Sequence, residues 1–228
     1  MEISKEELKS IPLFASASEQ TLAYLQSNIK VKIFDKGATV FSHKELLQNI
    51  YISLTGKFCL YKIGTNNDKR IIFIKDKGFL LNDTISTKKR SIIYCESFVK
   101  SKAIVIDKVK FIEAMKNDFD VTFAVVEQYS STLRKSYRQL KNAVTTIPVE
   151  KKMIAKIYSL CRDFGIKTDQ GVVIDMPITV TNLAEMIGAQ RETVSRVLKK
   201  LTQEGLLVHS NKKILIHDLE AIVNFYNK

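Results

Sequence analysis

The apolar positions of this chain change their period along its length. Before residue 115, short apolar runs alternate with glycine and polar turns, as in Ile50–Leu54, where every second side chain is apolar. Alternation indicates half-buried strands, and several short strands separated by turns predict an antiparallel barrel or roll. Short helices are expected between Glu6 and Asn28, and strands at residues 31–34, 39–41, 50–54, 58–63, 71–74, 91–98 and 103–106.

A second pattern begins at Phe119, where apolar residues recur at alternating spacings of four and three. This heptad period predicts one long helix that pairs in a left-handed coil. We favour pairing with a second copy over packing on its own domain, because the period persists for more than three heptads. The expected dimer interface consists of Phe119, Phe123, Val126, Ser130, Leu133, Tyr137, Leu140 and Val144.

The last third returns to helical spacing. Pro148 opens an amphipathic helix that ends near Gly165, and a short strand is expected at residues 172–174. A short apolar helix at Val180–Ile187 then leads across Gly188-Ala189 into a second helix. Two helices joined by a tight, glycine-containing turn form the helix-turn-helix of many DNA readers.

Two apolar runs, residues 206–208 and 214–216, follow these helices and flank a polar tip that contains Lys212 and Lys213. This pattern predicts a hairpin, or wing, and Asp218 is expected to cap a last helix. Charge runs are common on solvated faces, and any one polar residue is weak evidence for a DNA contact. The order helix, turn, helix and lysine-tipped hairpin is what favours DNA binding.

The segment from Thr179 to Leu201, T-V-T-N-L-A-E-M-I-G-A-Q-R-E-T-V-S-R-V-L-K-K-L, resembles the winged helix of the Crp/Fnr family of bacterial transcription regulators. The resemblance implies base reading by Arg191, Glu192 and Arg196, and backbone contacts from other polar side chains and the wing. Gln190 departs from the serine that close relatives often carry. The expected DNA-binding residues are Thr179, Gln190, Arg191, Glu192, Thr193, Ser195, Arg196, Lys199, Lys212 and Lys213.

The first half resembles the cyclic-nucleotide-binding β-roll of the same family, through I-P-L-F, F-D-K-G-A-T-V-F and I-Y-I-S-L-T-G-K-F. The expected fold class is α+β: an antiparallel, cupin-like β-roll, a long dimerisation helix and a winged helix-turn-helix. The corresponding domains are residues 1–116, 117–145 and 146–228.

The same resemblance implies a nucleotide pocket in which a Gly-Glu pair meets the ribose and Arg-Ser meets the phosphate. Arg90 and Ser91 fit the second element and are the candidate ligand-binding residues. The segment at residues 78–83 contains no Gly-Glu, and Ile92 stands where a small residue is expected. A buried ribose hydroxyl without an acceptor weakens binding, so we do not expect the roll to use cyclic AMP.

The net charge of +12 favours a polyanionic partner. Residues 1–144 carry 24 basic and 15 acidic side chains, a net of +9, so the charge is not concentrated on the helix-turn-helix. Locally, however, residues 188–213 carry six basic side chains against two acidic ones. This local excess supports contact with double-stranded DNA more directly than the total does.

The cysteine and histidine residues bear on three other inputs of a sensor domain: an iron–sulfur cluster, haem and a redox thiol. Cys59, Cys95 and Cys161 do not have the spacing of metal ligands. Three thiols are also fewer than the four thiolate ligands of an iron–sulfur cluster. The thiols are expected to be free in a reducing cytoplasm. His43 is the only histidine of the sensor half, so haem is not expected either, and no metal site is predicted. The cofactor is therefore unknown: an unidentified small-molecule effector, a redox thiol at Cys59 or Cys95, or no ligand at all.

No apolar run is long enough to cross a bilayer, and the charged N-terminus does not resemble a signal peptide, so a cytoplasmic protein without a membrane partner is expected. The chain carries no recognisable catalytic motif and is not expected to be an enzyme. The favoured function is a homodimeric transcription regulator on a palindromic operator, with RNA polymerase as an expected partner; activator and repressor are both left open. The alternatives are a replication or partition initiator, and a ligand-binding protein whose winged helix contacts another protein.

Overall fold

The computed structural model describes the backbone of residues 3–144 and 147–227, and the side chains of residues 3–140 and 147–224. The chain divides into two compact units, each described here by itself. The first, called the roll unit, is formed by residues up to 63 and by residues 72–137; the second, called the winged-helix unit, is formed by residues 64–71 and those from 138 on. The divisions predicted after residues 116 and 145 stay a prediction.

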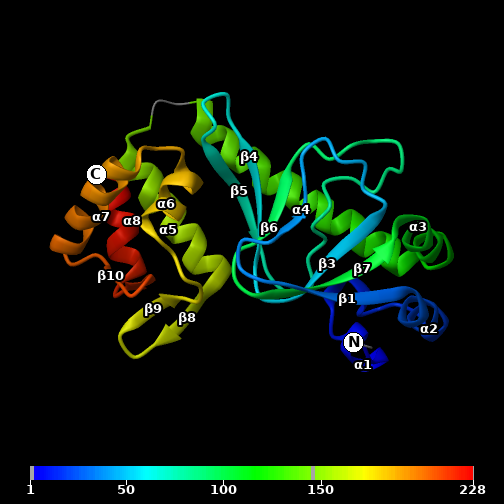
Figure 1. Cartoon of the computed structure of the whole chain (residues 1–228). Helices are drawn as coiled ribbons and strands as arrows, with labels where there is room; N and C mark the ends of the chain where they lie inside the picture. The colour runs from blue at the N-terminus through cyan, green and yellow to red at the C-terminus, as the bar shows by residue number, and fades with distance from the viewer. Residues whose placement is uncertain (1–2, 145–146, 228) are drawn as a thin grey trace. The chain divides into compact units, whose positions relative to one another are not determined.

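Two antiparallel sheets form the roll, as predicted (Figure 1). One has the strand order β1-β7-β3 and the other the order β2-β6-β4-β5. Aromatic and aliphatic side chains fill the space between them, with the rings of Phe34 and Phe58 edge to face at 5.9 Å. The strands are β1 (Ile29–Phe34), β2 (Thr39–Phe41), β3 (Asn49–Thr55), β4 (Phe58–Ile63), β5 (Lys69–Lys75), β6 (Tyr94–Ser97) and β7 (Ser101–Asp107).

A second core lies between the β1-β7-β3 sheet and helices at both ends of the roll sequence. The predicted N-terminal helices are α1 (Lys5–Lys9), the 3-10 turn η1 (Pro12–Phe14) and α2 (Glu19–Asn28). Helix α3 (Lys108–Asn117) was not predicted. It begins directly after β7, where the carboxylate of Asp107 accepts the N–H groups of Val109 and Lys110.

The long helix α4 (Phe119–Val144) has the predicted bounds. Its N-terminus is capped by Asp118, which accepts the N–H groups of Asp120 and Val121 through Oδ1 and that of Ser18 through Oδ2. Burial raises the pKa of Asp118, but hydrogen bonds from Ser18, Thr21 and Val121 outweigh burial, so the pKa lies below its ordinary value. One buried carboxylate therefore ties the start of α4 to the start of α2.

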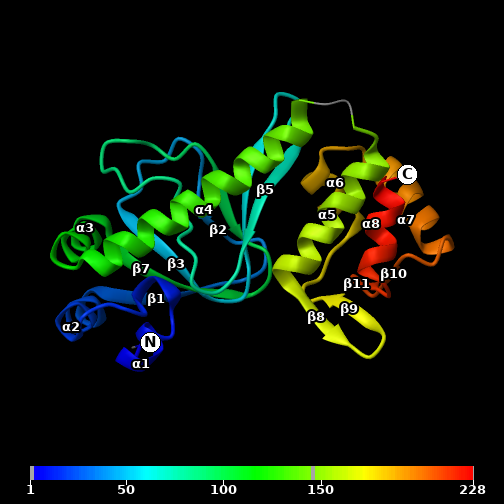
Figure 2. The same cartoon turned by 180° about the vertical axis from the view of Figure 1, so that it is seen from behind.

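Helix α4 runs along the strands of the roll (Figure 2), and polar contacts fasten its inner face to them. Gln128 donates to the carbonyl of Gly78 at 2.8 Å and accepts the N–H of Leu80 at 3.0 Å. The Tyr129 hydroxyl donates to the carbonyl of Asn82 at 3.2 Å. One turn further along the helix, Thr132 accepts from Nζ of Lys75 at 3.1 Å, and that amine also lies 4.8 Å from the centre of the Phe79 ring. These contacts place the roll segment of residues 75–82 along α4.

The winged-helix unit packs helices around a four-stranded antiparallel sheet in the order β10-β11-β9-β8. Strand β8 was not predicted, because all four of its residues are exposed and supply no apolar alternation. The elements are α5 (Val149–Phe164), β8 (Gly165–Thr168), β9 (Gly171–Ile174), α6 (Val180–Ile187), α7 (Arg191–Gln203), β10 (Val208–Ser210), β11 (Lys213–Ile216) and α8 (Leu219–Asn227). As predicted, Asp218 caps α8 by accepting two of its N–H groups.

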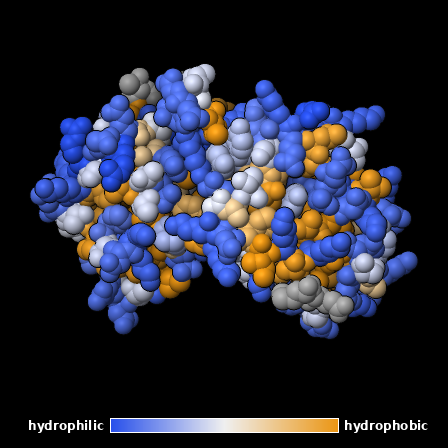
Figure 3. All heavy atoms as spheres, in the orientation of Figure 1, coloured by the Kyte–Doolittle hydropathy of each residue, from blue (hydrophilic) through white to orange (hydrophobic). Residues whose placement is uncertain are grey.

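Among the residues that the structure describes, no helix is long and apolar enough to cross a membrane. On the face drawn in Figure 3, hydrophilic side chains cover most of the surface and apolar ones form smaller patches between them.

Candidate nucleic-acid interface

Helices α6 and α7 form the predicted helix-turn-helix. Thr179 and Asn182 cap the start of α6 reciprocally, each side chain accepting the other residue's N–H at 3.1 Å. The helix ends at Gly188, whose φ of 65° lies in the left-handed region that glycine adopts without a Cβ penalty. The Gly188 N–H closes the last turn on the carbonyl of Ala184 at 2.8 Å. The start of α6 and the turn into α7 are thus both fixed by local chemistry.

Helix α7 separates its apolar and polar residues onto opposite faces. Val194, Leu198 and Leu201 are buried against the unit, as their spacing predicted. The candidate DNA-binding side chains of this helix are exposed, apart from the half-buried Thr193: they are Gln190, Arg191, Glu192, Ser195, Arg196 and Lys199. The guanidinium of Arg196 lies 3.4 Å from the Thr193 hydroxyl, one helical turn earlier. The structure therefore presents a continuous polar face over the first turns of α7.

Lys200 takes a different direction from Lys199. Its amine lies 3.1 Å from Oε1 of Glu150 on α5, which ties α7 to the neighbouring helix. The exposed Lys199 is therefore the better candidate for an external anion, in agreement with the residue chosen from the sequence.

The wing is a two-residue hairpin in which Ser210 pairs with Lys213. Asn211 and Lys212 both have positive φ, of 50° and 63°, as a type I′ turn requires. The candidate side chains Lys212 and Lys213 are exposed at this tip.

The wing is anchored at its tip and one strand to Ile178, the residue before the α6 cap. The Ile178 N–H donates to the carbonyl of Lys212 at 2.6 Å, and the Ile178 carbonyl lies 2.9 Å from Nε2 of His209. Ile178 is itself completely buried. Sequence reasoning missed the role of His209, because the pairing joins residues 31 positions apart and nothing in the local pattern indicates it. Among the described residues, no group of His, Cys, Asp and Glu could hold a metal ion.

The two candidate ligand-binding residues of the roll have different surroundings. Arg90 is exposed, and its guanidinium donates to the carbonyl of Lys44 at 2.9 Å. Ser91 is buried, and its hydroxyl donates to the carbonyl of Ile93 at 2.9 Å. The neighbouring Ile92 is 60% exposed. Both polar groups thus already contact the protein's own backbone.

The thiols offer no accessible redox site. Cys59, Cys95 and Cys161 are buried, and none of them forms a disulfide with another described cysteine. Burial raises the pKa of the Cys95 thiol well above its ordinary value, with smaller contributions from Cys59 and Glu96, and burial raises the pKa of Cys161 to about 12. Complete burial argues against a redox input at Cys59 or Cys95, and at Cys95 the raised pKa also disfavours the thiolate, which is the reactive form of cysteine.

The fold and the exposed helix-turn-helix define a DNA-binding transcription regulator with an N-terminal β-roll. The model of the Crp-like helix-turn-helix domain matches residues 147–225. The chain is 22% identical over 195 residues to the global nitrogen regulator of Synechocystis sp., covering 84% of this chain and 86% of that protein. It is 19% identical over 211 residues to the CRP-like cAMP-activated global transcriptional regulator of Mycobacterium tuberculosis, covering 92% and 94%.

Solved structures show the same fold. A mutant of CooA from Carboxydothermus hydrogenoformans matches with a TM-score of 0.78 and 16% identity, covering 94% of each chain. The c-di-GMP responsive global regulator CLP of Xanthomonas campestris matches with a TM-score of 0.75 and 15% identity, covering 88% of this chain and 100% of that one. Residues 147–225 are thus a Crp-like helix-turn-helix domain, and most of the chain is similar in sequence and fold to these Crp-like regulators.

The anchoring of the wing predicts the behaviour of a His209→Phe variant. It loses the hydrogen bond to Ile178, which is worth about 1 kcal/mol, and keeps only one of the two bonds that join the wing to Ile178. We expect weaker binding to all duplex sequences alike, measured by fluorescence anisotropy. His217→Phe is the matched control, since His217 bonds the carbonyl of Gln170 instead. Equal affinities of the two variants would show that the His209 contact does not position the wing.

Proposed function

We propose that this regulator acts as a homodimer whose two α7 helices read the halves of a palindromic operator, and that its roll responds to an input other than cyclic AMP. The observation that supports this most directly is the exposed polar face of α7 beside a lysine-tipped wing anchored at Ile178. The relatives named above are transcription regulators, in agreement with this proposal. We expect the regulator to be cytoplasmic and to contact RNA polymerase.

The dimer proposal rests on the outer face of α4. Phe119, Phe123, Val126, Leu133, Tyr137 and Leu140 are between 50% and 76% exposed, although all six are large and apolar. Exposed apolar surface of this extent and continuity is typical of interaction sites. Ser130 is also exposed in the row, and the side chain of Val144 lies outside the described residues. Pairing with a second copy through the same row would bury it symmetrically.

Substitution of Leu133 by lysine tests this pairing. Two copies of the charge would face each other in a desolvated seam, and we expect the variant to be monomeric at micromolar concentration in sedimentation velocity. Ser131→Lys adds the same charge to an exposed neighbouring position outside the heptad row, and this control should stay dimeric. A monomeric wild type, or equal behaviour of the two variants, would contradict the proposed interface.

The two-fold symmetry of such a dimer would be matched by half-sites about 34 Å apart. Binding should weaken steeply with salt, because phosphate contacts release counterions.

We assign base contacts to Arg191, Glu192 and Arg196. We assign backbone contacts to Thr179, Thr193, Lys199, Lys212 and Lys213. Gln190 and Ser195, exposed on the same face, complete the proposed contact surface.

Two variants separate base reading from backbone contact. Arg191→Ala should lose about 1–3 kcal/mol of discrimination at one base position, since arginine pairs specifically with guanine. Lys212→Ala should weaken specific and random duplexes equally and reduce the salt slope by about 1. Competition binding with single-base operator variants measures both. Lys167→Ala removes an exposed lysine of β8 as a control. Equal losses on operator and random DNA for Arg191→Ala would reverse the assignment.

The proposal that the roll does not use cyclic AMP rests on the engaged polar groups of its candidate pocket. Arg90 and Ser91 both bond backbone carbonyls of the roll. A nucleotide would have to break these contacts, and no Gly-Glu pair would compensate at the ribose. The relative from Mycobacterium tuberculosis is cAMP-activated by its name, so this chain is proposed to differ from it.

Titration calorimetry with cyclic AMP and cyclic GMP measures this difference. We expect no saturable heat, and no change in operator affinity when either nucleotide is present. Micromolar binding that also tightens the operator complex would overturn the proposal.

A further inference from the structure

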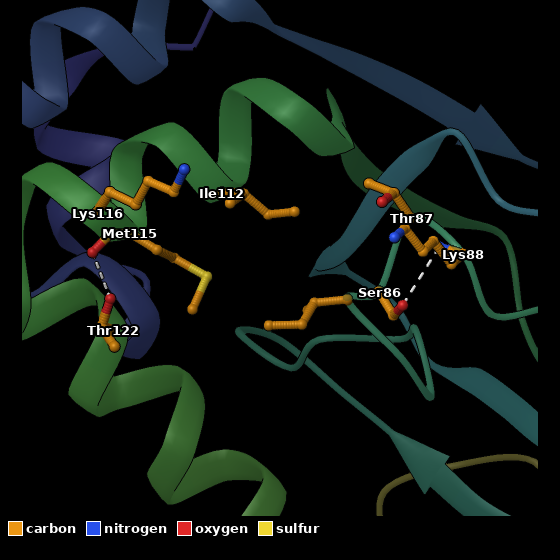
Figure 4. A pocket seen from close by; sticks show the side chains of 8 residues that line it. Ser86, Thr87, Lys88, Ile112, Met115, Lys116 and Thr122 are labelled. Atoms are coloured by element: carbon orange, nitrogen blue, oxygen red, sulfur yellow. Dashed lines mark hydrogen bonds between the residues drawn. The ribbon is translucent and has the colours of Figure 1, made fainter.

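A surface cavity of about 580 Å³, largely open to solvent, lies in the roll unit between residues 85–88, helix α3 and the start of α4. This volume is within the range of small-molecule sites. Figure 4 shows the residues that line it, with the side chains of Ile112 and Met115 extending from α3 toward the open space. Arg90 and Ser91, the candidate nucleotide-binding residues, do not line it, so the cavity is a separate feature of the roll.

The floor of the cavity is aliphatic. Ile85 and Met115 pack against the helical core of the unit, and Ile112 lies beside them half-buried. Apolar area that stays in contact with water favours an apolar ligand, at about 25 cal/mol per Å² removed from water. The floor therefore suits a hydrocarbon or aryl tail.

The rim of the cavity is basic. Lys88 reaches it from the loop and Lys116 from α3, and both are exposed. Among the described residues that line the cavity, none is acidic. Charge complementarity therefore selects an anionic head group over a neutral or cationic one.

The loop that carries Lys88 is fixed by the protein. The buried Lys108 donates from Nζ to the carbonyl of Ser86 at 3.2 Å, and the Ser86 hydroxyl accepts the N–H of Lys88 at 3.2 Å. The nearby carboxylate of Asp83 accepts the N–H of Ile92 at 2.7 Å, and so holds the other end of the same loop. These bonds keep the wall opposite α3 in place without a ligand.

We propose that this cavity binds a small amphiphilic carboxylate, of the kind represented by a medium-chain fatty acid. The tail lies over Ile85, Ile112 and Met115, and the carboxylate lies between Lys88 and Lys116. The site needs neither DNA nor a second copy of the chain.

The methyl resonance of one methionine reports on the cavity. Met115 lines the cavity, whereas Met153, Met176 and Met186 belong to the winged-helix unit. In protein labelled with ¹³C at the methionine methyl groups, titration with octanoate should shift the Met115 resonance saturably and leave those three unmoved. Met115→Leu identifies the resonance. The absence of a saturable shift would overturn the proposal.

Charge and position are tested with matched ligands and variants. 1-Octanol and octylammonium, which have the same chain length, should bind more weakly than octanoate. Lys88→Gln and Lys116→Gln should each weaken octanoate binding about two- to fivefold, as expected for exposed ion pairs. Lys89→Gln, the adjacent lysine outside the cavity, should not. Equal binding of the three ligands, or equal losses for Lys88→Gln and Lys89→Gln, would show that the basic rim does not select a carboxylate.

Discussion

The fold depends on one helix that has to satisfy two different environments. The inner face of α4 is held against residues 75–82 by Gln128, Tyr129 and Thr132, and Val121 and Val125 are buried beside them. Its outer face carries a row of large apolar side chains that the same chain leaves exposed. Because a helix is rigid, any change in how the inner face docks also moves the outer row. If α4 pairs as proposed, this coupling gives the roll a physical route to the geometry of the pair.

The contacts of the inner face of α4 also set the free energy that an effector would have to overcome. Gln128 bonds both the carbonyl of Gly78 and the N–H of Leu80. Displacement of the Gln128 side chain would therefore take away the hydrogen-bond partner of two backbone groups. Each such bond contributes about 1 kcal/mol net, and the contacts of residues 128–132 together amount to a few kcal/mol. Differences of this size separate states that a ligand can interconvert. An effector that displaces or reinforces this small set would be sufficient to shift the equilibrium.

The sequence predicted those parts of the structure that follow from local periodicity. The bounds of α4, the α6-turn-α7 pair and the wing were readable because their apolar spacing and turn residues are contiguous. Helix α3 was missed because it follows β7 without a break, and β8 because it buries no side chain. The bonds from Asp118 to Ser18 and from His209 to Ile178 join residues 100 and 31 positions apart. No local pattern encodes such contacts, so the capping of α4 and the anchoring of the wing had to come from the structure.

The wing shows a conflict between local preference and proposed role. A two-residue hairpin of this type favours glycine at its second position, yet Lys212 stands there with a φ of 63°. The left-handed conformation costs a residue with a Cβ roughly 1–2 kcal/mol. The neighbouring bond from Ile178 to the Lys212 carbonyl helps to hold that conformation, and the side chain is left exposed. Backbone strain that the surroundings maintain is characteristic of functional positions. The proposed contact with a polyanion would account for a cation at the tip of an anchored hairpin, whereas the stability of the turn alone would favour glycine.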